Sequence, residues 1–120
     1  MAEIFVIKAA EFKDGDRRLV RTLRGEVGVF AHEGGYYAYA NQCAHTGGPA
    51  CEGILIPRTL EIIDDNKMYV GQTYSDQMNI ACPWHGWEYD LKSGQCVGAP
   101  KHRLKKYETV VRGGDLFVVV

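Results

Sequence analysis

Short apolar runs separated by turn-forming residues make up most of the chain. From Glu26 to His32, Val27, Val29 and Ala31 alternate with Gly28 and Phe30, and a period of two is typical of a β-strand. Other short apolar runs predict strands over residues 3–9, 36–40, 88–91, 104–112 and 116–120, and a strand–turn–strand unit over 59–73. A hairpin is expected where Glu33, Gly34 and Gly35 separate two of these runs.

The overall pattern predicts an all-β protein. No stretch of a dozen residues keeps an apolar period of 3.6, so no long amphipathic helix is expected. Many short strands, together with 14 glycines for tight turns, indicate a sandwich or a barrel. The 120 residues suit one domain, residues 1–120, with room for one core.

Charge and composition exclude several functional classes. The 14 basic and 15 acidic residues give a net charge of −1, unlike the strongly basic balance of a nucleic-acid-binding protein. No apolar run approaches the roughly 20 residues that cross a bilayer, and residues 1–8 lack the features of a signal peptide. We therefore expect a soluble protein of the cytoplasm, where cysteines serve mostly as metal ligands, redox groups or core residues.

Two short motifs supply the candidate metal ligands. Cys43-Ala44-His45 and Cys82-Pro83-Trp84-His85 each offer one thiolate and one imidazole from a predicted loop. Such a set fits either a tetrahedral Cys₂His₂ zinc site or a Rieske [2Fe–2S] cluster, in which two Cys bind one iron and two His bind the other. The mixed Cys/His pairs suit the cluster better than the usual zinc spacings, and a zinc-stabilised binding module stays as an alternative.

Residues 43–49 and 82–90 resemble the two cluster-binding loops of the Rieske iron–sulfur family, and Gly98-Ala99-Pro100 resembles its Pro loop. The resemblance covers roughly residues 26–120. It implies a small antiparallel β sandwich with a cluster-binding subdomain formed by two loops. It also implies one [2Fe–2S] cluster per chain, with Cys43, His45, Cys82 and His85 as ligands.

Departures from the family pattern point to its soluble, oxygenase-associated members. Gly48 and Trp84 stand where Rieske proteins of cytochrome bc complexes carry a disulfide, and Trp87 stands where they place a serine hydroxyl against a cluster sulfur. Tyr89 matches a family tyrosine that hydrogen-bonds a ligand thiolate. With fewer donors to the cluster, the resemblance implies a reduction potential in the lower part of the Rieske range of about −150 to +300 mV.

The resemblance implies a soluble one-electron carrier between a flavin-dependent reductase and a terminal oxygenase or hydroxylase. Ring-hydroxylating oxygenases carry a further mononuclear iron domain for which this chain has no room, and His32 and His102 are its only other histidines. We therefore expect an electron-transfer component of a multi-component oxygenase system that is not itself an enzyme, and we expect a monomer. A small accessory subunit of a nitrite reductase-like complex is a second possibility.

Several further features receive expectations of their own. Cys51 and Cys96 match no ligand position and are expected to be buried small residues. His32, at the end of a strand, is expected at the surface. The basic run from Lys101 to Lys106 is either a solvated strand edge or a docking patch for an acidic partner. The 36 residues between His45 and Cys82 exceed those of many family members, and the excess is either a docking element or a decorated loop.

Overall fold

Two antiparallel sheets form the protein. The computed structural model describes residues 2–42, 48–63, 69–83, 87–99 and 101–120. The elements are β1 (Glu3–Lys8), η1 (Ala9–Glu11), β2 (Arg17–Thr22), β3 (Gly25–His32), β4 (Gly35–Ala40), η2 (Ala50–Glu52), β5 (Ile54–Ile63), β6 (Tyr69–Ala81), β7 (Glu88–Asp90), β8 (Lys106–Arg112) and β9 (Asp115–Val119). The predicted antiparallel all-β class is confirmed.

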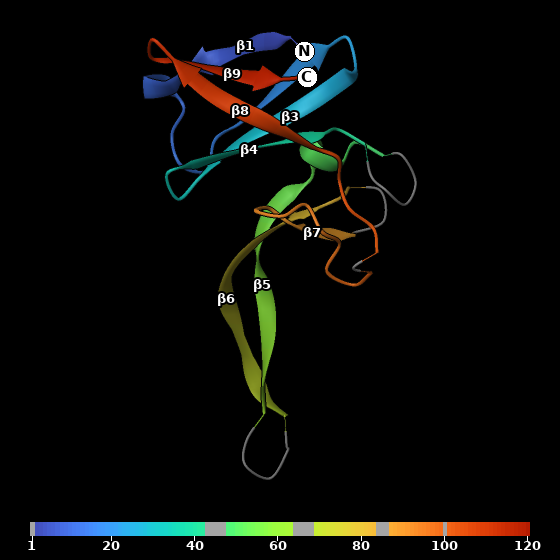
Figure 1. Cartoon of the computed structure of the whole chain (residues 1–120). Helices are drawn as coiled ribbons and strands as arrows, with labels where there is room; N and C mark the ends of the chain where they lie inside the picture. The colour runs from blue at the N-terminus through green and yellow to red at the C-terminus, as the bar shows by residue number, and fades with distance from the viewer. Residues whose placement is uncertain (1, 43–47, 64–68, 84–86, 100) are drawn as a thin grey trace.

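The larger sheet has six strands in the order β1-β9-β8-β4-β3-β2. It forms the upper body in Figure 1, and both chain ends lie on it because β1 pairs with β9. Its apolar face packs into a first core, the sheet core: Val6, Phe12, Val27, Val29, Ala31, Ala38, Leu116 and Val118.

Strand β3 is buried on both faces. Val27, Val29 and Ala31 enter the sheet core, whereas Phe30 belongs to a second core on the opposite face. The alternation in the sequence therefore reflects two apolar environments, one for each face of the strand. The prediction that His32 lies at the surface is wrong, since this residue is only 9% exposed. Burial extends to the last residue of β3, which is His32. The His32 Nε2 atom lies 3.5 Å from Glu33 Oε1.

The second core, here called the junction core, fills the space between the two sheets. Its buried members come from both sheets and from the loops that join them: Phe30, Tyr39, Ala50, Cys51, Ile80, Cys82, Tyr89, Leu91, Cys96 and Leu104. Tyr39 of β4 is fully buried, and its hydroxyl donates to the carbonyl of Leu91 beyond β7 at 2.5 Å. One side chain thus ties the larger sheet to the smaller one.

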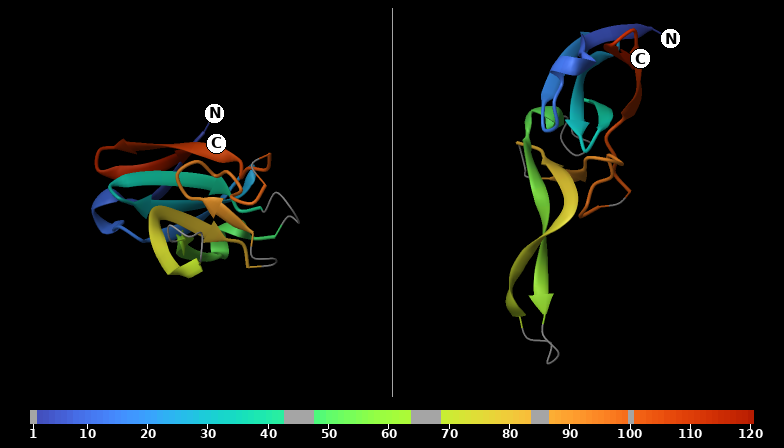
Figure 2. Two further views of the ribbon diagram at one scale, coloured as in Figure 1. Left: turned by 90° about the horizontal axis from the view of Figure 1, so that it is seen from below. Right: turned by 90° about the vertical axis from the view of Figure 1, so that its left-hand side faces the viewer.

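The smaller sheet has the order β5-β6-β7, and β5 and β6 extend from it as a long hairpin. Figures 1 and 2 show this hairpin projecting away from the body. Strand β7 pairs with Asn79–Ala81 of β6 at the base of the hairpin, and its Tyr89 also forms an isolated bridge with Cys96. In the described residues beyond this base, β5 and β6 pair as a two-stranded ribbon. The predicted unit over 59–73 is therefore part of a longer hairpin, whose turn at 64–68 lies outside the described residues.

The sequence pattern missed strand β2, Arg17–Thr22. Its four basic or hydroxyl side chains among six residues do not alternate with apolar ones, because β2 is an edge strand and mostly exposed. Its backbone nevertheless pairs with β3 in unbroken register from Arg17–Phe30 to Thr22–Gly25.

Among the residues that the structure describes, no helix is long and apolar enough to cross a membrane.

Gly28 of β3 generates a stability prediction. A Cβ at this position would lie 2.3 Å from Cys51 Cβ and 2.6 Å from its Sγ, so Gly28 leaves the space that Cys51 fills. Gly28→Ala should lower the free energy of unfolding by about 1–3 kcal/mol, as expected for overpacking. Urea denaturation would measure the change.

Gly98→Ala is the matched control, since a Cβ there would meet nothing within 4 Å. Equal stability of the two variants would contradict the packing constraint between Gly28 and Cys51.

Candidate iron–sulfur site

The two predicted ligand motifs fall in the chain between elements that the structure describes. The first loop, residues 41–49, joins β4 to η2, and the second loop, residues 82–87, joins β6 to β7. Of the four predicted ligands, Cys82 is described, whereas Cys43, His45 and His85 lie outside the described residues. The site is therefore described through Cys82 and through the segments that flank the two loops.

Backbone packing brings these flanks together. Ile54, just after η2, pairs with Ala81, just before Cys82. A Cβ on Gly53 would lie 1.6 Å from the Ala81 carbonyl oxygen, so only glycine permits this approach. The segment that follows the first loop and η2 thus lies against the start of the second loop.

Cys82 occupies a buried position at the base of the second loop. Its residue is 1% exposed and belongs to the junction core with Tyr89, Ala50 and Cys51. Its amide donates to the Trp87 carbonyl at 2.7 Å, which closes the second loop on itself. Cys82 therefore stands at the start of a loop whose two ends are held together, as a rigid ligand position requires.

Cys51 and Cys96 have a different role. Both are buried and neither is in a disulfide, which confirms the expectation of buried residues. The Cys51 thiol lies 3.4 Å from the Tyr39 carbonyl oxygen, and burial raises its pKa to about 12. Cys51 therefore stays a protonated thiol at neutral pH and packs as a core residue.

Asn41 closes the first loop. Its Oδ1 accepts a hydrogen bond from the Cys51 amide at 2.8 Å, which joins the first residue of the loop to η2, the element that follows it. Its Nδ2 donates to Glu26 Oε1 at 2.8 Å and to Glu52 Oε2 at 3.0 Å. One amide side chain therefore links β3, the first loop and η2.

Arg17 holds the same segment from the other side. Its Nη1 donates to the Cys51 carbonyl at 2.9 Å and also to the Gly53 carbonyl. Its guanidinium lies 5.9 Å from the centre of the Phe30 ring. We call the contacts of Asn41 and Arg17 with residues 51–53 the loop clamp. Sequence reasoning missed both residues, because neither lies in a ligand motif and Arg17 is on the strand that the pattern did not predict.

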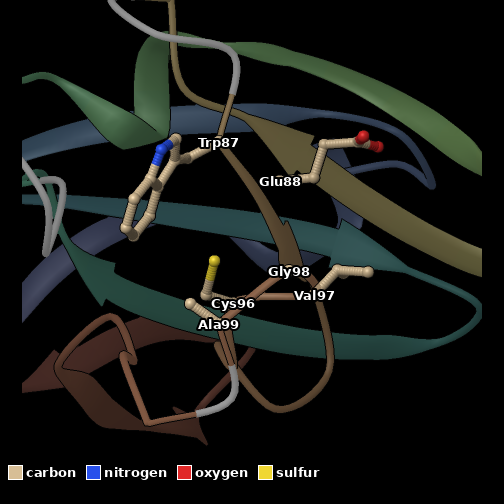
Figure 3. A pocket seen from close by; sticks show the side chains of 6 residues that line it. All are labelled: Trp87, Glu88, Cys96, Val97, Gly98 and Ala99. Atoms are coloured by element: carbon tan, nitrogen blue, oxygen red, sulfur yellow. The ribbon is translucent and has the colours of Figure 1, made fainter.

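An open pocket of about 410 Å³ lies beside the second loop, lined by Trp87, Glu88, Cys96, Val97, Gly98 and Ala99. Figure 3 shows the Cys96 sulfur pointing toward the side on which the Trp87 ring lies. The ring of His102 meets the Trp87 ring edge-on, with 5.6 Å between the ring centres. The segment predicted as a Pro loop, of which Gly98 and Ala99 are described, therefore lies next to the second loop.

A comparison with protein-family models finds the Rieske [2Fe-2S] domain over residues 2–108. The chain belongs to the Rieske [2Fe–2S] domain family. The predicted family is thereby confirmed, and with it an iron–sulfur cluster as the cofactor of the domain.

Individual proteins agree with this assignment. The Rieske domain is 25% identical over 121 residues to the 3-phenylpropionate/cinnamic acid dioxygenase ferredoxin subunit of Photorhabdus laumondii, covering 100% of this chain and 96% of that protein. It is similar in fold to a chain in the complex of reduced oxygenase and oxidized ferredoxin in carbazole 1,9a-dioxygenase (TM-score 0.70, 21% identity, 98% and 92% covered).

A third similar structure carries another name. It is described as a candidate small subunit of an NADPH nitrite reductase, with a TM-score of 0.69, 17% identity and full coverage of both chains. At this identity the likeness of the Rieske domain to either solved structure concerns the fold.

The loop clamp gives a second prediction. Asn41→Ala leaves the Cys51 amide without its acceptor. This change should lower the free energy of unfolding by about 1–3 kcal/mol. Urea denaturation would measure this loss. The first loop should open more often, so a chelator should remove iron faster from the variant than from the wild type.

Asp14→Ala is the matched control, because it also removes the side-chain acceptor of a backbone amide, that of Glu33, at the exposed turn between β3 and β4, the opposite end of β4 from the first loop. If the two variants release iron at the same rate, Asn41 does not hold the first loop.

Proposed function

We propose that this Rieske domain binds one [2Fe–2S] cluster through Cys43, His45, Cys82 and His85 and works as a soluble one-electron carrier to an oxygenase or hydroxylase. The observation that carries the proposal is the pairing of Ile54 with Ala81, which brings the segment after the first loop against the start of the second. The position of Cys82 directly after Ala81 supports it further.

When bound, the cluster would accept one electron and give it up again. The chain's own residues would hold the loops and exclude water. The clamp of Asn41 and Arg17 fixes the end of the first loop, and the hydrogen bond between Cys82 and Trp87 closes the second. Tyr89, fully buried in the same core as Cys82, suits the predicted role of donor to a ligand thiolate.

The proposed partners are a flavin-dependent reductase as electron donor and a terminal oxygenase as acceptor. Similar proteins named as a dioxygenase ferredoxin subunit and as a ferredoxin–oxygenase complex favour the oxygenase as acceptor. The similarity to a candidate nitrite reductase subunit favours a second role, as an accessory subunit of such a complex. The same proposal includes a single domain over residues 1–120, a monomeric state and a cytoplasmic location. The unbridged thiols of Cys51 and Cys96 agree with the cytoplasmic location, where thiols stay reduced.

The cluster assignment predicts two irons per chain. The dithionite-reduced protein should give an EPR signal whose average g value is lower than that of an all-cysteine [2Fe–2S] cluster, because histidine ligates one iron. Substituting Cys43 or Cys82 by Ser, or His45 or His85 by Ala, should abolish this signal and lower the iron content.

Cys51→Ser and Cys96→Ser serve as controls of the same chemistry and should keep both irons. Zinc in place of iron would favour a zinc-stabilised module, and iron loss in the control variants alone would overturn the ligand assignment.

The environment of the cluster predicts a low reduction potential, in the lower part of the Rieske range of about −150 to +300 mV. Trp87 stands where some family members offer a serine hydroxyl to a cluster sulfur. Trp87→Ser should raise the midpoint potential, since a hydrogen bond worth about 1.4 kcal/mol corresponds to about 59 mV for one electron. Spectroelectrochemistry would measure the shift.

Trp87→Ala makes the same cavity without a hydroxyl, so the difference between the two variants isolates the donor. A wild-type midpoint in the top third of the range, or equal midpoints of both variants, would contradict this explanation.

A further inference from the structure

A cationic segment, here called the basic strap, follows the predicted Pro loop and leads into β8. Its charged members are all exposed, whereas Leu104 in its middle is 3% exposed and anchors it in the junction core. The basic strap comprises Lys101, His102, Arg103, Leu104, Lys105 and Lys106. Its cationic side chains therefore face solvent from a fixed backbone.

Backbone contacts hold the basic strap against the site. The Cys96 amide donates to the His102 carbonyl at 2.9 Å, and the Leu104 amide donates to the Gly94 carbonyl at 2.8 Å. The His102 ring also packs edge-on against Trp87, which closes the second loop. The strap is thus attached to the loop that carries Cys82 and His85.

The charges of the basic strap are not neutralised in the described part of the chain. The ion pairs found there involve His32, Lys92 and Arg112 with Glu33 or Glu3, and none uses the strap. The sequence has no acidic residue from Leu91 to Tyr107, although the whole chain has a net charge of −1. The segment that contains the strap is therefore basic throughout, and the acidic residues next to it in sequence are Asp90 and Glu108.

Protection of a strand edge does not explain these charges. Strand β8 lies inside the six-stranded sheet, between β4 and β9, and Lys106 pairs with Tyr39 of β4. Residues 101–105 precede this internal strand and cover no open edge of the larger sheet. A cation cluster on a solvent-facing strap beside a redox loop instead resembles a steering surface for an oppositely charged protein.

We propose that the basic strap is the docking surface for a carboxylate-rich face of the electron acceptor, the oxygenase component. This inference rests on the proposed function, because it places the partner beside the loop through which the electron would leave. The attraction would raise the rate of encounter and fall with ionic strength, since exposed charges are screened within about 8 Å at physiological salt.

Stopped-flow reduction of cytochrome b5, a haem protein with an acidic face, by the reduced holoprotein tests the inference. The variant Lys101→Glu/Arg103→Glu/Lys105→Glu should lower the second-order rate constant about tenfold or more at low ionic strength. The difference should largely vanish at about 0.5 M salt. The neutral variant Lys101→Gln/Arg103→Gln/Lys105→Gln should fall between the two.

The matched control is Arg18→Glu/Arg21→Glu/Arg24→Glu, which makes the same charge change at exposed positions on and just after β2, an edge strand three places from β8 in the larger sheet. Its rate constant should change by no more than about twofold. With the basic protein cytochrome c as acceptor, reversal of the strap should increase the rate.

The reduced EPR signal of each variant must first show that its cluster is intact. Equal rate losses in the strap and control variants, or no loss in the strap variant, would then overturn the docking surface. A wild-type chain that holds no iron would instead overturn the proposed function and this inference together.

Discussion

The hydrogen bond from the Cys51 amide to the Asn41 side chain is the contact on which the candidate site most depends. It joins the first residue of a loop that carries two of the four predicted ligands to η2, the element that follows the loop. Arg17 reinforces it through the carbonyls of Cys51 and Gly53, and Gly28 leaves the space that Cys51 occupies. Because these residues come from β2, β3, the first loop and η2, the larger sheet directly sets the position at which the smaller sheet begins.

The junction core extends this connection to the second loop. Cys82, Tyr89 and Cys96 share it with Phe30 and Tyr39 of the larger sheet. Burial raises the pKa of Tyr39 well above its ordinary value, so its hydroxyl remains a donor to the Leu91 carbonyl. A redox centre gains from such rigidity, because ligands held in one geometry in both oxidation states need little rearrangement when an electron moves.

The sequence pattern predicted elements whose two faces differ and missed those that depend on distant partners. Strand β3 was predicted from its alternation, and the buried positions of Cys51 and Cys96 from their mismatch with the ligand motifs. Strand β2 was not predicted, because its side chains are mostly exposed and only its backbone pairing with β3 defines it. Asn41 carries no signal of its own, since its partners lie at positions 26, 51 and 52. His32 was placed wrongly because a strand end does not reveal what covers it.

The hairpin of β5 and β6 has a consequence for how this family can vary. Gly53 and the pairing of Ile54 with Ala81 fix its base, and β7 joins only that base. The outer ribbon can therefore grow or shrink without moving the loops, provided that residues are gained or lost as cross-strand pairs that keep the register. The tip of the hairpin is therefore a position at which a new segment can be inserted, in evolution or by protein engineering, while the base of the hairpin keeps its geometry.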